Sequence, residues 1–250
     1  MATVETLYRY PVKGFSPEAL GETMLERGRP VAGDRIYAIE NGPSGFDPAA
    51  PAFQPKMKFL CLMKNARLAR LTTRLDPATH DWAIKGADGG LTTSLAEAAG
   101  RAAAADWLTG FMGEELRGPL RVLHAPGHSF SDVGKPYISL INLATVAALG
   151  LIVGRVVDPL RFRANVYLTG LAPHAELDLI GREAMLGTAR VAIVKRTRRC
   201  VATNVDPVTA ERDMDIPATL QRSFDHMDCG VYAEVLEAGV VRSGDRLAVI

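Results

Sequence analysis

The stretch Lys195-Arg-Thr-Arg-Arg-Cys-Val-Ala-Thr-Asn-Val-Asp-Pro207 places four cationic residues within five positions of one cysteine. The residues before it, Arg190-Val-Ala-Ile-Val194, are typical of a β-strand, so Cys200 is expected near a strand end. Cationic neighbours favour the thiolate, which is both a nucleophile and a metal ligand. The stretch therefore predicts a reactive or metal-bound sulfur beside a polyanion, with a solvated basic face as the alternative.

The overall charge limits where an anion could bind. The chain has 250 residues, with Lys+Arg 29 against Asp+Glu 28, and a net charge of +1. This balance argues against a nucleic-acid-binding protein, which usually carries a clear basic excess. Any anion site must therefore be a local concentration of cations.

The cysteines and apolar runs indicate the compartment. Three cysteines, Cys61, Cys200 and Cys229, do not form a disulfide framework, and no segment at the start of the chain resembles a signal peptide. The longest apolar run, residues 147–153, is too short to cross a bilayer. We expect no membrane association and a reducing cytoplasm.

Alternating apolar and polar residues predict many short strands and few helices. In the first half we expect strands at residues 4–10, 20–25, 34–40, 66–75 and 81–85. A helix is predicted over residues 94–111, with Ser94 and Glu97 as a capping box. This pattern favours a mainly β, α+β protein built on a β-barrel with α insertions.

The second half continues the pattern. Strands are predicted at residues 120–124, 137–141, 166–168, 190–194, 230–237 and 244–250. Asn142 is expected to cap an apolar helix reaching residue 149, and residues 210–223 are expected to be partly helical.

Several cationic and polar side chains stand at strand ends. Lys13 lies in a Pro/Gly turn after the first strand, and Arg35 opens a later one. Arg161, Arg163 and Asn165 would share one face of an extended segment, because strand side chains repeat every two residues. Exposure of these side chains to solvent is the competing interpretation. Three polar groups on one face, next to an apolar strand, would need a partner.

Four separated segments resemble MOSC-domain proteins that carry the N-terminal MOSC β-barrel domain. They are Tyr10-Pro-Val-Lys13, Asp34-Arg35, Phe162-Arg-Ala-Asn165 and Arg199-Cys-Val-Ala-Thr-Asn-Val-Asp-Pro207, with further likeness at residues 230–234 and 241–245. The resemblance is to the branch containing the mitochondrial amidoxime-reducing component and bacterial YcbX. It implies an N-terminal domain over residues 1–93 and a MOSC domain over 94–250, with the first strands packing against the latter.

The resemblance also implies roles for seven residues. Cys200 is the implied molybdenum ligand, and Asp132 is implied to line the metal site. The residues implied to hold the pterin of the molybdenum cofactor (Mo-molybdopterin) and its phosphate are Lys13, Arg35, Arg163, Asn165 and Arg199. The chemistry of these side chains agrees with the implied roles. Arginine guanidinium groups and a lysine charge bind phosphate well, and a soft thiolate is a suitable metal ligand.

Four features depart from the family pattern. Gly14 stands where relatives often have serine, Ala164 replaces a common proline and Asn204 a common threonine. The Gly/Pro-rich loop at residues 41–55 also differs and could reshape the mouth of the substrate site. These departures weaken the assignment of a substrate more than they weaken the expectation of cofactor binding.

The implied activity is reduction of N-oxygenated or N-hydroxylated small molecules by abstraction of an oxygen atom at molybdenum. Electrons would come from a separate donor protein, a ferredoxin, a flavoprotein or a cytochrome b5-like protein, because the chain has no cysteine cluster for an iron–sulfur centre. The alternatives are a sulfur carrier or cofactor-binding module without its own turnover, and an anion-binding protein with no redox role.

Overall fold

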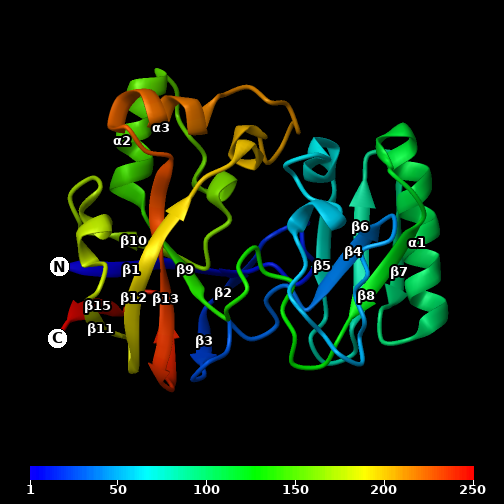
Figure 1. Ribbon diagram of the computed structural model, residues 1–250, viewed down its shortest axis with the longest axis horizontal. Helices are drawn as coiled ribbons and strands as arrows, with labels where there is room; N and C mark the ends of the chain where they lie inside the picture. The colour runs from blue at the N-terminus through cyan, green and yellow to red at the C-terminus, as the bar shows by residue number, and fades with distance from the viewer.

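The computed structural model describes residues 1–250, which form two halves lying side by side along the long axis (Figure 1). The half that contains both termini is a β-barrel, and the other half holds a three-stranded sheet, a two-stranded sheet and the longest helix. No helix is long and apolar enough to cross a bilayer.

The barrel is a closed ring of seven strands, in the order β10-β9-β13-β12-β11-β15-β1 and back to β10. Neighbouring strands are antiparallel except for β9 and β10, which are parallel. The ring strands are β1 (Ala2–Arg9), β9 (Ile138–Asn142), β10 (Val166–Thr169), β11 (Glu183–Leu186), β12 (Ala189–Arg198), β13 (Asp228–Glu237) and β15 (Arg246–Val249). The predicted fold class, mainly β with α insertions on a β-barrel, is confirmed.

The period-two pattern of the ring strands fills the barrel interior. Val191 and Ile193 on β12, and Val231, Ala233 and Val235 on β13, are all buried in one cluster of 20 apolar residues. Two shorter strands lie beside the ring: β2 (Glu18–Leu20) pairs with β1, and β3 (Glu22–Leu25) pairs with β14 (Gly239–Arg242). Strand alternation alone therefore specifies which face of each strand is inside.

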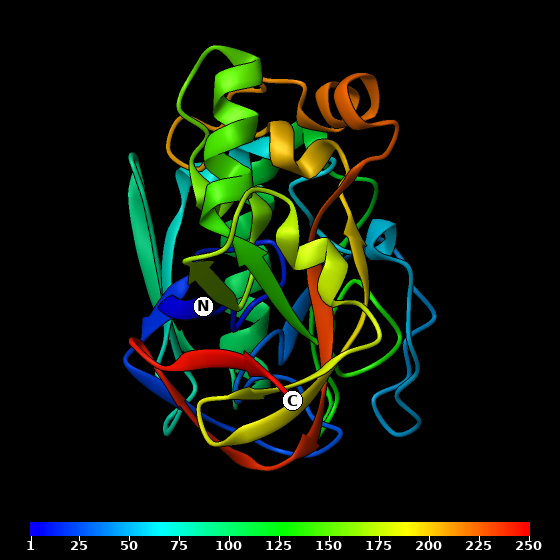
Figure 2. The same ribbon diagram turned by 90° about the vertical axis from the view of Figure 1, so that its left-hand side faces the viewer.

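Two helices pack against one end of the barrel, where they lie close together (Figures 1 and 2). They are α2 (Leu143–Val153) and α3 (Ile216–Phe224). As predicted, Asn142 caps α2, and its side chain accepts a hydrogen bond of 3.1 Å from the amide of Ala144.

The other half is built around a second apolar cluster that contains the fully buried Trp82. Its strands are β4 (Tyr37–Asn41) paired with β8 (Leu120–His124), and β5 (Thr72–Leu75), β6 (Asp81–Gly86) and β7 (Gly89–Ser94) in a second sheet. Helix α1 (Ala98–Met112) packs on β7 and β8 and buries Leu108 and Met112 in this cluster. The division of the chain at residues 93 and 94 stays a prediction.

Short 3-10 helices replace regular structure at several turns. They are η1 (Lys56–Lys58), η2 (Ala66–Arg70), η3 (Gly113–Glu115), η4 (Pro159–Phe162), η5 (Ala175–Leu179) and η6 (Val201–Asn204). The strand predicted over residues 66–75 is therefore wrong in its first half, because η2 precedes β5. The capping box is also wrong: α1 begins at Ala98 after Glu97, which makes no side-chain cap, and Ser94 ends β7.

Candidate functional site

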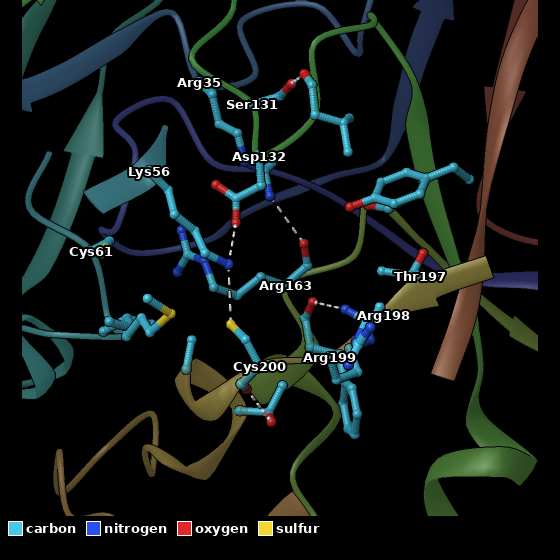
Figure 3. A pocket seen from close by; sticks show the side chains of 18 of the residues that line it. Arg35, Lys56, Cys61, Ser131, Asp132, Arg163, Thr197, Arg198, Arg199 and Cys200 are labelled. Carbon is cyan, nitrogen blue, oxygen red and sulfur yellow. Dashed lines mark hydrogen bonds and ion pairs between the residues drawn. The ribbon is translucent and has the colours of Figure 1, made fainter. Parts of the chain in front are cut away.

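A cavity of about 290 Å³ lies between the two halves, and residues from both halves line it. Its walls include all seven residues singled out from the sequence: Lys13, Arg35, Asp132, Arg163, Asn165, Arg199 and Cys200. They lie in five separated segments: the turn after β1, the segment before β4, the β8–β9 loop, the approach to β10 and the end of β12. The structure thus brings the predicted residues to one place, and several of them are drawn in Figure 3.

The charge of this cavity is strongly one-sided. Nine of its lining residues are cationic: Lys13, Arg35, Lys56, Arg161, Arg163, Lys195, Arg196, Arg198 and Arg199. Asp132 is the one acidic residue among them. In a chain whose net charge is only +1, this is the local concentration of cations that an anion site requires.

Cys200 stands where β12 gives way to η6. The carbonyl oxygen of Cys200 accepts hydrogen bonds from the amide of Thr203 at 3.0 Å and from its hydroxyl at 2.9 Å. The thiol is half-buried and lines the cavity, so its Sγ is available to a ligand there. The expectation that Cys200 lies near a strand end is confirmed by the structure.

Lys56 is a member of the site that the sequence reasoning missed. Its Nζ lies 3.2 Å from Sγ of Cys200 and 3.6 Å from Oδ2 of Asp132 (Figure 3). Burial lowers the pKa of Lys56, but the negative charges of Asp132 and Cys200 outweigh burial, so the pKa is raised. Lys56 follows the unusual Gly/Pro loop, and its charge at that loop's end is the only signal the sequence offers.

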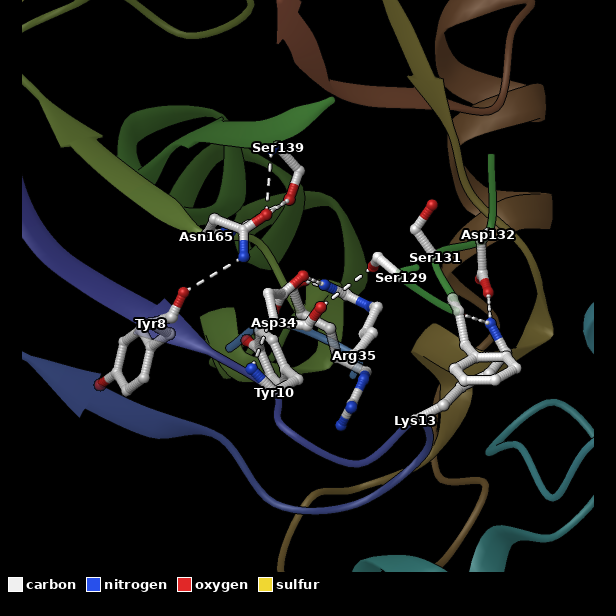
Figure 4. A network of polar contacts seen from close by, with 12 residues as sticks. Tyr8, Tyr10, Lys13, Asp34, Arg35, Ser129, Ser131, Asp132, Ser139 and Asn165 are labelled. Carbon is white, nitrogen blue, oxygen red and sulfur yellow. Dashed lines mark hydrogen bonds and ion pairs between the residues drawn. The ribbon is translucent and has the colours of Figure 1, made fainter. Parts of the chain in front are cut away.

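Asp132 joins two lysines. It forms an ion pair with Lys13, whose Nζ also donates a hydrogen bond of 2.8 Å to the carbonyl of Phe130 (Figure 4). Lys13 is 3% exposed, and burial lowers its pKa although Asp132 opposes this. Burial raises the pKa of Asp132, yet Lys13 and Lys56 outweigh that effect and hold it well below its usual range. Asp132 is therefore a carboxylate fixed between two cations.

Arg35 and Arg163 lie over the same buried ring. Their guanidinium carbons are 4.9 Å and 4.3 Å from the centroid of Tyr10, which is cation–π contact. Arg35 pairs with Asp34 and donates to the carbonyl of Arg163 at 3.2 Å. Both arginines have left-handed backbones, with φ of 54° and 51°. Arg35 therefore precedes β4 and does not open a strand.

The prediction that Arg161, Arg163 and Asn165 share the face of an extended segment is wrong. Arg161 lies in η4, and Arg163 ends that turn in the left-handed region. The side chain of Arg161 is 1% exposed and pairs with Asp206 and Asp213 at 2.8 Å each. Its Nη1 also donates to the carbonyl of Asn204 at 3.1 Å, so Arg161 stabilises the turn that follows Cys200.

Asn165 uses its amide within the protein. Its Oδ1 accepts hydrogen bonds from the amide and hydroxyl of Ser139 at 3.1 Å and 2.9 Å, and its Nδ2 donates to the carbonyl of Tyr8 at 3.2 Å (Figure 4). These bonds tie the entry of β10 to β9 and β1. Asn165 lines the cavity, but its contacts in the structure position the backbone.

Four buried polar atoms on residues of the cavity wall have no hydrogen-bond partner in the protein, and one of them is Nε of Arg161. Arg199 donates from Nε to the carbonyl of Cys229 at 2.7 Å and from Nη1 to that of Phe162 at 2.9 Å, which leaves Nη2 unpaired. Nη2 of Arg163 and Oγ1 of Thr197 are likewise unpaired. Because buried polar groups are almost always hydrogen-bonded, these atoms indicate a place for a ligand with acceptor oxygens.

The other two cysteines differ from Cys200. Cys61 lines the cavity but is buried, and burial raises its pKa. Cys229 is fully buried, and burial raises its pKa to about 12. No three His, Cys, Asp or Glu side chains gather into a group that could hold a metal by themselves. A metal at this site would therefore need ligands beyond the Cys200 thiolate.

Two solved structures are distantly similar to this chain. YiiM from Geobacillus stearothermophilus is 21% identical, with a TM-score of 0.37, over 45% of this chain and 53% of YiiM, so the matched part spans about half of that protein. The YUAD protein from Bacillus subtilis is 13% identical, with a TM-score of 0.47, over 99% of this chain and 94% of that one. At these scores neither carries an argument about function, and no curated protein matches the sequence.

Protein families give a direct match to both halves. The MOSC N-terminal beta barrel domain matches residues 1–115, and the MOSC domain matches residues 128–248. Together the two matches include every residue of the cavity wall. The chain is therefore a MOSC-domain protein that carries the MOSC N-terminal beta barrel domain.

Proposed function

We propose that this protein binds the molybdenum cofactor, with Cys200 as the protein ligand of the metal, and reduces N-oxygenated or N-hydroxylated small molecules. The observation that carries the proposal is the wall of the cavity. A half-buried thiol stands among nine cations, and four buried donors on the cavity wall lack partners. Membership of the MOSC family agrees with a cofactor of this kind.

The donor set fits a phosphorylated, sulfur-rich cofactor. Arg163 and Arg199 each use part of the guanidinium on backbone carbonyls and keep Nη2 for a ligand, so their forks are already oriented. Thr197 adds a hydroxyl. We infer that these three side chains, with Arg35 near Arg163, hold the anionic part of the cofactor, and that Lys13 adds charge from the side of Asp132.

The bound cofactor would supply the redox chemistry, in which the metal takes an oxygen atom from the substrate. The protein's contribution is to bind, orient and balance charge. Lys56 donates a hydrogen bond to Sγ of Cys200 and so fixes the position of the sulfur. Asp132 stands between Lys13 and Lys56, where it fixes both ammonium groups at the cavity wall.

Electrons would reach the site from a separate donor protein, a ferredoxin, a flavoprotein or a cytochrome b5-like protein. The chain has three cysteines, fewer than the four thiolates that hold an iron–sulfur centre. This part of the proposal is tested by adding candidate donors to loaded protein and measuring substrate reduction.

A sulfur carrier is the second candidate, because the ammonium group 3.2 Å from Cys200 would also stabilise the anion of a persulfide. In that case Cys200 carries sulfur and no metal is required. Mass spectrometry of the purified protein separates the two: a persulfide confined to Cys200, in a sample without molybdenum, supports the carrier.

Elemental analysis tests the leading proposal. Protein expressed with molybdate in a host that makes the cofactor should contain close to one molybdenum per chain, and Cys200→Ala should contain almost none. Cys229→Ala is the matched control, because this cysteine is buried away from the cavity and its loss should leave the metal bound. Wild-type protein without molybdenum would overturn the proposal.

A further inference from the structure

A second hollow adjoins the cavity. It is a groove of about 670 Å³ whose walls come from residues 27–30, from the 41–55 loop through Pro51 and Phe53, and from the loop between β8 and β9. Ser131 and Val133 line both the groove and the cavity. They flank Asp132, so a short piece of chain is the common boundary of the two spaces.

The groove is cationic. Arg27, Arg29 and Lys135 line it, and no acidic residue does. Glu26 lies outside the lining and pairs with Arg29 at 3.4 Å, with both side chains 61% exposed, so this pair is weak. Burial lowers the pKa of His128, which also lines the groove and is therefore mostly neutral at pH 7. The groove thus carries a net positive charge without a cofactor role to explain it.

The boundary between groove and cavity is held by the site's own residues. The amide of Phe130 donates to the carbonyl of Arg35 at 2.7 Å, and Lys13 donates to the carbonyl of Phe130 at 2.8 Å. The hydroxyl of Ser129 donates to the carbonyl of Asp34 at 3.0 Å (Figure 4). The segment that separates the two spaces is therefore fixed relative to the cations of the cavity.

An aromatic ring forms one wall of the groove. Phe53 is 49% exposed, and its ring lies 3.6 Å from the position that a side-chain carbon on Gly134 would take. The ring therefore packs against the β8–β9 loop. The groove offers a flat apolar surface beside Arg27, Arg29 and Lys135.

We propose that the substrate carries an anionic group, a phosphate or a carboxylate, which binds in this groove while its reacting end lies at Cys200. The proposal rests on the proposed function and names a class within it: N-hydroxylated compounds with an anionic substituent. Because Ser131 and Val133 line both spaces, a molecule that lies along this segment would contact the groove and the cavity together. The groove's cations, which lie outside the cavity, are then left for the substrate.

A matched pair of ligands tests the proposal: an N-hydroxylated nucleoside and its 5′-monophosphate. Their dissociation constants are measured by equilibrium dialysis at low ionic strength, and their kcat/KM with molybdenum-loaded full-length protein. The monophosphate should be preferred, and Arg27→Gln/Arg29→Gln should lower the preference roughly 2- to 30-fold, the range for two exposed charge interactions. Arg74→Gln, at an exposed position on β5 outside both spaces, should leave the preference unchanged.

The outcomes separate this inference from the proposed function. Equal dissociation constants for the two ligands would overturn the proposal that the groove binds the anionic group. So would a preference for the monophosphate that the double variant retains. A preference lost in Arg199→Gln but retained in the double variant also overturns it, because the phosphate then binds in the cavity. If the loaded protein turns over neither ligand, the proposed function is overturned. In that case, tighter binding of the monophosphate than of the nucleoside, lost in the double variant, still supports an anion-binding groove. Inorganic phosphate that displaces the monophosphate but not the nucleoside supports it as well.

Discussion

Replacing Arg161 with methionine removes the buried cation that joins two carboxylates below the Cys200 turn. The arginine side chain is 1% exposed, and Asp206 and Asp213 are 23% and 15% exposed. Removing one partner of a buried ion pair costs about 3–5 kcal/mol, because the other charge stays buried without compensation. Since both aspartates retain some contact with water, we expect the lower end, about 3 kcal/mol. For a chain of this size that corresponds to roughly 6–12 °C in Tm.

Arg190 provides the matched control. It also pairs with two carboxylates, Glu183 at 2.5 Å and Glu237 at 2.7 Å, but its side chain is 38% exposed on the outside of the barrel. Exposed pairs contribute about 0.2–1 kcal/mol each, so Arg190→Met should cost far less than Arg161→Met. Urea titration of both variants measures the difference. Equal losses would show that burial does not decide the strength of these pairs.

The pH dependence of the Arg161 variant has a definite sign. Burial raises the pKa of Asp206, but backbone amides and Arg161 outweigh it and lower the pKa. A carboxyl with a lowered folded pKa contributes stability that is present above its unfolded pKa of about 4 and is lost as pH falls through the folded value. The gap between wild type and Arg161→Met should therefore be widest near neutral pH and should narrow below about pH 4. A gap that widens in acid would refute this account.

Two further predictions concern thiols and a glycine. At pH 8, iodoacetamide should label the native protein once, at Cys200, because burial raises the pKa of Cys61 and raises that of Cys229 to about 12. The unfolded protein should take three labels. Fast labelling of the native Cys200→Ser variant would contradict this prediction. Gly230→Ala should destabilise the protein by more than about 1–2 kcal/mol in urea titration, because φ of Gly230 is 81° and the new Cβ would lie 2.5 Å from a carbonyl oxygen of β9. Gly110→Ala is the control: this glycine lies in open space on α1, so its replacement should be neutral or stabilising.

Short sequence patterns correctly predict those features of the fold that depend on residues close together in the chain. The alternation of residues 190–194 predicts the strand that leads to Cys200, and the position of Asn142 before an apolar run predicts the cap of α2. Both depend on contacts within a few positions of the chain. The barrel class followed in the same way, from the number of short alternating strands.

The extended face proposed for Arg161, Arg163 and Asn165 failed because two local features break the period of two. Asp158 caps the turn that Pro159 begins, which makes η4, and Arg163 then adopts a left-handed backbone. A 3-10 turn rotates successive side chains by about 120° instead of the alternation of a strand, so residues 161, 163 and 165 do not share a face. A Pro after an Asp was the signal in the sequence, and it should have been interpreted as the start of a helical turn.

Other parts of the site depend on tertiary contacts that no local pattern contains. Lys13 and Asp132 pair across 119 positions, and Lys56 meets Cys200 across 144. Only the resemblance to one family predicts that Lys13 and Asp132 belong to the same site. Lys56 lies outside those segments, so neither the family pattern nor periodicity could indicate it.

The contacts around Cys200 also explain why the two halves form one functional unit. Arg212 donates to the carbonyl of Val201 at 2.9 Å and to those of Leu62 and Met63 at 3.0 Å each, so one guanidinium joins the turn after the cysteine to the opposite half. In addition, β1 closes the barrel between β10 and β15, although it lies in the part matched by the N-terminal domain. A barrel without the N-terminal part would have two unpaired edges and an unsupported Cys200 turn. The cavity can therefore form only when both domains are present.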